Sequence, residues 1–123
     1  MSPPLLNLEI IESVCTQMAT AEAKKNFWVE SLTLSLDSLN SSFVKYKAAI
    51  VEKNPVELSK AAHKISGTIG FVGASKLCER LNALHAECES GTISWPLGDD
   101  TAIRAAVSQV MAELEAALLC PPV

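Results

Sequence analysis

Aromatic residues, positive charge and long apolar runs are scarce in this chain of 123 residues, and each shortage excludes a class of protein. Aromatics make up only 5% of the residues, while Leu, Ala, Ile and Val are frequent. Because strands of sandwiches and barrels favour aromatic and β-branched residues, this composition favours packed helices. No apolar run approaches the ~20 residues that a membrane-spanning helix needs, so we expect no insertion into a membrane.

Charge and cysteine usage indicate which partners and which cellular compartment fit the chain. The formal net charge is −4, which argues against a nucleic-acid binder. Residues 1–8 lack the basic and long apolar segments of a signal peptide, so we predict none. No CxxC pair occurs, and we therefore expect a reduced, cytoplasmic protein. The four cysteines are Cys15, Cys78, Cys88 and Cys120.

Apolar residues spaced by three and four predict five helices. We place these helices at about residues 5–19, 22–53, 55–69, 74–90 and 99–119. Asn54 is a favourable N-cap, Pro55 is tolerated at the first helical position, and Gly91 is a plausible stop. Asp99 or Asp100 can cap the last helix. The fold class predicted is all-α, an up-and-down antiparallel four-helix bundle with a short extra N-terminal helix. One monomeric domain covers residues 1–123.

The third predicted helix carries the functional signal. His63 follows Ala62, which lies on the apolar stripe, so His63 is rotated by ~100° toward solvent. Small residues dominate its neighbours on that face, although a glycine inside a helix costs ~1 kcal/mol relative to alanine. A helix face with such small side chains predicts a docking surface on which a partner can reach the His63 ring. The neighbouring positions hold Ser59, Lys60, Ser66, Gly67 and Gly70.

Positive charge collects around this helix. Residues 45–80 hold seven basic residues against three acidic ones, a local charge of +4 that leaves −8 for the remainder. Such a strip favours an anionic ligand or an acidic partner, and a solvated helical surface is the plainer interpretation. A neutral imidazole is a good nucleophile toward an aspartyl phosphate. If His63 accepts a phosphoryl group from such an aspartyl phosphate, Lys60 and Lys64 would offset the charge of that group. Phe71 and Lys76 would contact the protein that carries the aspartyl phosphate.

Residues 61–81 resemble the signature of histidine phosphotransfer (HPt) domains. The Ala62-His63 pair, the apolar Ile65, Gly67 four residues after the histidine, the Gly73-Ala74 pair and Leu77 fit that pattern. The resemblance implies a phosphorelay step from a receiver aspartate to His63 and on to a response-regulator aspartate. The predicted entry helix at residues 5–20 resembles that of the HPt modules at the C-termini of hybrid sensor kinases. Such a module needs no cofactor of its own, because Mg²⁺ belongs to the partner receiver domain.

Two departures from the family pattern stand out. Ser66 occupies the position three after the histidine where a basic residue is expected. Many members carry a glutamate on the next helix, where this chain has His85. We interpret His85 as a boundary residue, and a second ring that faces the site is the alternative.

Other functions fit the sequence less well. No Walker A motif or glycine-rich nucleotide loop is present, so we expect no autonomous kinase activity. A helical interaction bundle that binds receiver domains without phosphotransfer is the main alternative. Cys78, His85 and Cys88 are spaced by seven and three, which is a weak zinc pattern, and the prediction is that no metal binds.

Overall fold

The computed structural model describes residues 4–121, and every regular element in that range is a helix. In chain order the helices are α1 (Glu9–Thr16), α2 (Ala21–Glu52), α3 (Pro55–Phe71), α4 (Ser75–Ser90) and α5 (Asp100–Leu118). This confirms the all-α prediction. Within that range no helix is both long enough and apolar enough to cross a membrane.

Side chains and backbone geometry set most of the helix ends. The Thr20 hydroxyl accepts a hydrogen bond from the Ala23 N–H at the start of α2. The Asn54 side chain accepts from two N–H groups at the start of α3, beside Pro55. Gly91 ends α4 in the left-handed conformation, with φ of 72°. The predictions for Asn54 and Gly91 are confirmed.

One predicted end is wrong, and one predicted cap lacks its side-chain bond. Asp99 occupies the N-cap position of α5, as predicted, but its side chain makes no capping hydrogen bond. The Asp100 carboxylate accepts from Arg104 and from the Tyr46 hydroxyl. The first helix is shorter than the predicted 5–19, because the backbone before it bonds elsewhere. The Leu5 and Leu6 N–H groups donate to the Glu113 carboxylate, and the Asn7 N–H donates to the Val72 carbonyl.

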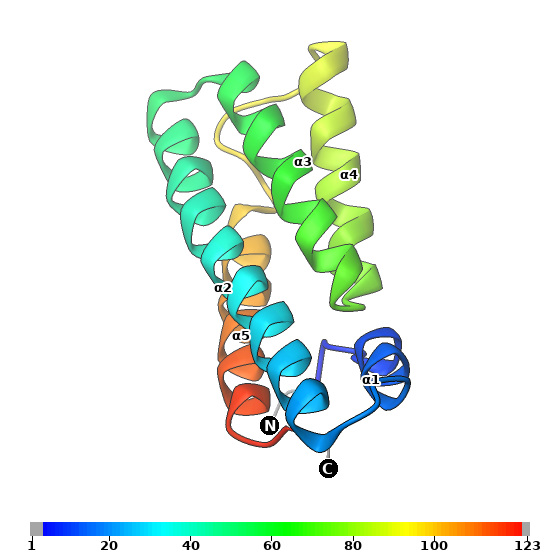
Figure 1. The fold of residues 1–123 in the computed structure, drawn as a ribbon. Helices are drawn as coiled ribbons and strands as arrows, with labels where there is room; N and C mark the ends of the chain where they lie inside the picture. Colours follow the sequence, from blue (N-terminus) through cyan, green and yellow to red (C-terminus); the bar gives the residue numbers. More distant parts are fainter. Residues whose placement is uncertain (1–3, 122–123) are drawn as a thin grey trace.

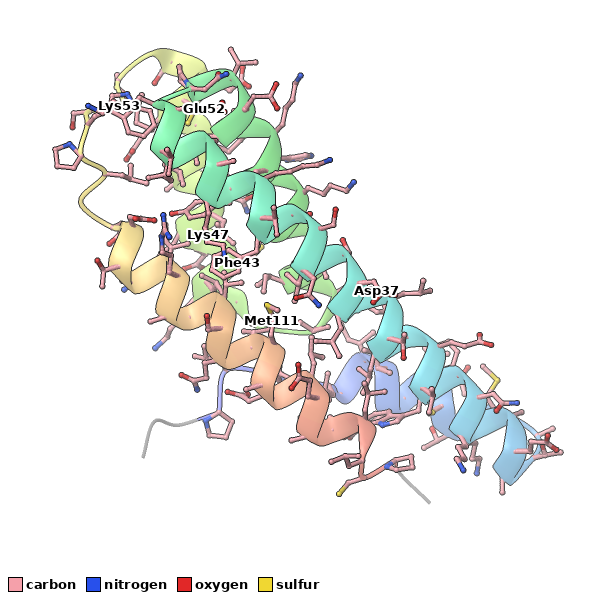
Figure 2. The ribbon with its side chains drawn as sticks, turned by 90° about the vertical axis from the view of Figure 1, so that its left-hand side faces the viewer. Asp37, Phe43, Lys47, Glu52, Lys53 and Met111 are labelled. Atoms are coloured by element: carbon pink, nitrogen blue, oxygen red, sulfur yellow. The ribbon has the colours of Figure 1, made fainter. Side chains whose placement is uncertain are left out.

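The long helix α2 packs beside both α3 and α5, and α4 packs beside α3 and α5 (Figure 1). Hydrogen bonds tie the seam between α2 and α5 near both of its ends. The Trp28 indole N–H donates to the Ala117 carbonyl at 2.9 Å, and the Tyr46 hydroxyl donates to Asp100 at 2.9 Å. Within α2 the Lys47 ammonium lies 4.6 Å from the centre of the Phe43 ring, close to Met111 of α5 (Figure 2). The two hydrogen bonds hold α5 against the helix that supports α3.

The core is mainly aliphatic and continuous. Fully buried side chains come from every helix, among them Ile11, Leu39, Ile65, Leu81 and Leu114. The buried stripe of α3 is Leu58, Ala62, Ile65 and Ile69, as the spacing predicts. Because this stripe is fully inside, the residue that follows Ala62 lies at the rim of the packed face.

The turn between α3 and α4 depends on a glycine. Gly73 has φ of 82°, and a Cβ there would collide with the Asn7 carbonyl of the N-terminal segment. Val72 is fully buried while Phe71 keeps 46% of its surface exposed. The turn therefore anchors the N-terminal segment and leaves one aromatic ring outside.

Candidate functional site

The His63 imidazole lies on the surface of α3, as predicted from its place beside the apolar stripe. Among the residues that the structure describes, neither nitrogen of the ring has a hydrogen-bond or ion-pair partner. The ring is thus available to an external electrophile. It stands on a regular helix within the packed core, which fixes its backbone.

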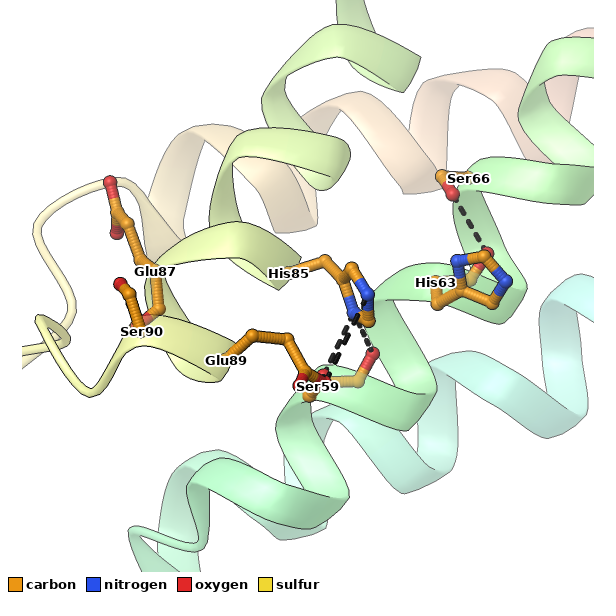
Figure 3. A network of polar contacts seen from close by, with 7 residues as sticks. All are labelled: Ser59, His63, Ser66, His85, Glu87, Glu89 and Ser90. Atoms are coloured by element: carbon orange, nitrogen blue, oxygen red, sulfur yellow. Dashed lines mark hydrogen bonds and ion pairs between the residues drawn. The ribbon is translucent and has the colours of Figure 1, made fainter.

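A second imidazole faces it. His85 of α4 lies with its ring centre 5.0 Å from that of His63, and the two planes are tilted by 35° (Figure 3). The interpretation of His85 as a mere boundary residue is therefore wrong. His85 is one position past the buried Leu84, as His63 is one past Ala62, so both rings emerge at the seam between α3 and α4.

The side chains of His85, Ser59 and Glu89 form a polar network beside His63. The Nδ1 atom of His85 lies 2.8 Å from the Ser59 hydroxyl and 3.1 Å from the Ser59 carbonyl oxygen. The same hydroxyl donates to the Glu89 carboxylate at 2.9 Å. That carboxylate lies 4.0 Å from Nε2 of His85. Ser59 and Glu89 thus hold the His85 ring from α3 and α4 together.

The expectation that Ser59 and Ser66 belong to an open face is wrong. Each is only 5% exposed, because both lie in the seam with α4. The Ser66 hydroxyl donates to the His63 carbonyl at 2.7 Å, and the Cys78 thiol donates to the Ser66 carbonyl at 3.4 Å. The Ser66 hydroxyl thus satisfies a backbone group, whereas the Ser59 hydroxyl bonds side chains of α4, so both serines act beneath the site and not on its surface.

Gly67 and Gly70 do leave the surface beside His63 open. A Cβ at Gly67 would meet nothing within 4 Å, and one at Gly70 would make ordinary contact with Cys78. Packing therefore demands a glycine at neither position. Gly67 and Phe71 also line a shallow groove of about 350 Å³ between α3 and α2, with the exposed Leu34 on its other side.

The predicted lysines lie at the surface of α3 and at the start of α4. Lys60, Lys64 and Lys76 are all exposed. The Lys60 ammonium lies 3.6 Å from the Glu57 carboxylate, and both side chains are more than half exposed. An exposed pair of this kind holds its members weakly, so Lys60 remains able to turn toward an anion.

The zinc pattern does not form a metal site. Among residues 4–121, no three histidine, cysteine or acidic side chains stand together in a way that would hold a metal ion. Cys78 and Cys88 are free thiols packed against the core. Burial is the main factor that raises the pKa of the Cys88 thiol, so the free protein holds this thiol in its neutral form.

Comparisons of the chain with protein-family models, with curated proteins and with solved structures give no match.

Proposed function

We propose that this chain is a histidine phosphotransfer module of a two-component phosphorelay, with His63 as the phosphoryl carrier. The observation that carries the proposal is the exposed imidazole whose two nitrogens are unengaged by the described residues, beside Gly67 on a rigid helix. A structural histidine would be expected to bury its ring or to bond its nitrogens.

The transfer that we propose is a simple exchange of bonds. A lone pair on one His63 nitrogen attacks the phosphorus of a receiver aspartyl phosphate, a P–N bond forms, and the P–O bond to the aspartate breaks. The aspartate leaves as a carboxylate, and the ring keeps its proton on the other nitrogen. Attack on the phosphorus by a second receiver aspartate reverses these changes and frees the ring.

The proposed architecture agrees with this role. We propose that α2 to α5 form an up-and-down antiparallel four-helix bundle, with α1 as the extra helix. This is supported by α2 packing beside α3 and α5 and by α4 packing beside the same two helices. Such a bundle presents one long side of α3 to a partner while its core stays closed.

A receiver domain would dock over the open part of this side. The groove at Gly67 and Phe71 offers apolar surface, and Lys60, Lys64 and Lys76 offer positive charge to the acidic pocket of the receiver. Mg²⁺ would be held by the receiver. The surrounding charge would raise the association rate more than it would stabilise the complex.

The acceptance step tests the proposal. The chain is incubated with a receiver domain that carries labelled aspartyl phosphate, and the labelled residue is located by mass spectrometry under conditions that preserve phosphohistidine. We expect the label on His63, and no label on the His63→Gln variant, while His85→Gln still accepts it. A chain that binds the receiver yet takes no label would instead be an interaction bundle without phosphotransfer.

A further inference from the structure

The ring of His63 pairs with one other ring among the described residues, that of His85, whose centre lies 5.0 Å away. Beside it on α3 stands Gly67, which offers no side chain to restrict the ring. A helical histidine without such a neighbour exchanges between several staggered orientations. The His85 ring of α4 is therefore placed to limit the orientations of the His63 ring.

The contacts of His85 fix which of its nitrogens carries the proton. The Ser59 carbonyl can only accept, and it lies 3.1 Å from Nδ1. The Ser59 hydroxyl has one hydrogen, which it donates to Glu89, so toward Nδ1 it also accepts. Both neighbours require Nδ1–H as the donor. The neutral His85 ring thus has its proton on Nδ1, and this bond holds the ring to α3 one helical turn before His63.

We propose that His85 is a positioning residue for His63. The network of Ser59 and Glu89 locks the His85 ring, and the face of this ring restricts the rotation of His63, so that one nitrogen is presented to the receiver. The inference rests on the proposed phosphotransfer function. It assigns no bond to phosphorus and no proton transfer to His85 itself.

The size of the expected effect on the transfer rate follows from the number of His63 ring orientations that His85 would exclude. A histidine in a helix has about two favoured χ1 wells and two broad χ2 orientations, so holding one of them favours attack by at most about fourfold. The fold does not depend on the ring, because the Ser59 hydroxyl keeps Glu89 as its partner when His85 is removed. His85→Ala should therefore fold and isolate the positioning effect.

Two variants separate the contribution of the His85 ring face from the contribution of its Nδ1–H bond. His85→Ala removes the ring, whereas His85→Phe keeps an aromatic face and removes the Nδ1–H donor. Glu87→Ala is the matched control, since Glu87 is exposed on the same helix and points away from both rings (Figure 3). Circular dichroism checks that each variant is helical.

The first readout needs no phosphotransfer. Nitrogen-15 spectra of the free protein identify the tautomer of His85, and side-chain relaxation measures the order of the His63 ring. We expect the Nδ1–H tautomer, a clear loss of His63 order in His85→Ala, a partial loss in His85→Phe, and none in Glu87→Ala. An Nε2–H tautomer, or unchanged order in His85→Ala, would overturn the proposal.

The second readout is the rate at which the label passes from a phosphorylated receiver to His63. We expect His85→Ala to lower the maximal rate by about two- to fourfold without changing the receiver concentration at half-saturation. A change in that concentration alone would show a docking role and overturn positioning. If the unmutated chain takes no label, the proposed function fails, and the order of the His63 ring still decides whether His85 positions it.

Discussion

At Gly67, access to the site and stability of the helix oppose each other. The residue lies well inside α3, is exposed, and has no neighbour that would obstruct a side chain. Glycine costs ~1 kcal/mol relative to alanine at such a position. Since side chains in a helix lean toward its N-terminus, a side chain on residue 67 would lie over His63. A glycine here therefore keeps the ring accessible at the expense of stability.

We predict that Gly67→Ala and Gly67→Leu both raise the stability of the chain and differ in transfer. Each should raise the free energy of unfolding by about 0.5–1 kcal/mol, a shift in Tm of roughly 2–5 °C. The leucine should lower the rate of phosphoryl acceptance at least about tenfold by covering His63, and the alanine should have little effect. Thermal melts and the labelling assay measure the two properties.

Gly70→Ala serves as the control for Gly67, because a Cβ there only contacts Cys78 and residue 70 lies about one helical turn farther from His63 than residue 67. If Gly67→Leu folds and accepts the label at the normal rate, the face that contains Gly67 is not where the receiver docks.

His63 could be selected from the sequence because its offset from the apolar stripe is visible there. A second ring at His85 is only the alternative interpretation of the sequence, and it comes from the glutamate that the resembling family carries at that position. Periodicity within one helix does not say which neighbour it packs against or at what level. The meeting of the two rings depends on how α3 and α4 are aligned, and so does the burial of Ser59 and Ser66 between them.

Among the helices, α2 and α5 are joined by the buried Tyr46. Its side chain is fully enclosed, and its hydroxyl donates to Asp100. Burial first, and then the bond to this carboxylate, raise the pKa of the phenol well above its ordinary value near 10. The folded chain thus keeps the phenol protonated where the unfolded chain loses the proton.

We predict a loss of stability above about pH 10 that is specific to Tyr46. Below that pH both states bind the proton, so Tyr46 makes no pH-dependent contribution. Above it the unfolded state binds fewer protons, and the free energy of unfolding falls by up to about 1.4 kcal/mol per pH unit. Urea unfolding between pH 8 and about pH 11 measures this fall, with Tyr46→Phe as the reference that lacks it.

The chain offers a direct check, since Tyr46 is its only tyrosine. The near-ultraviolet absorbance of phenolate should appear only as the protein unfolds. Ionisation of the Tyr46 phenol near pH 10 while the protein is still folded would contradict its buried hydrogen bond to Asp100.

The helix boundaries show what local sequence can predict. Asn54, Pro55 and Gly91 act on backbone groups within a few residues, so their effects are visible in the sequence. The start of α1 depends instead on Glu113, more than a hundred residues away, which takes the N–H groups of Leu5 and Leu6. A long-range bond of this kind leaves no periodic signal, and the predicted helix began too early.

Over the whole molecule, charge is distributed unevenly. The segment 45–80 carries +4 on a chain of net charge −4, and it contains His63 and the exposed Lys60, Lys64 and Lys76. Attraction between exposed charges is screened by salt, with a Debye length of ~10 Å at 0.1 M. An acidic receiver pocket should thus be drawn toward α3 and away from the acidic remainder of the surface.

We predict that Lys64→Glu lowers the rate of transfer several-fold at low salt and that added salt slows the unmutated chain. Glu115→Lys on α5 is the control, since Glu115 is exposed and remote in sequence from the site. Glu113 on the same helix is not used as the control, because its carboxylate accepts hydrogen bonds from the N–H groups of Leu5 and Leu6. A rate that responds to neither salt nor Lys64→Glu would show that the lysines are only a solvated surface.

Passage of a phosphoryl group between two receivers tests the central claim most directly. One receiver with labelled aspartyl phosphate and a second, unlabelled receiver are mixed with the chain, and label on the second receiver is followed in time. The account predicts rapid labelling with the unmutated chain and only background labelling with His63→Gln or without the chain. Equal labelling of the second receiver in all three mixtures would contradict the assignment of His63 as a phosphoryl carrier.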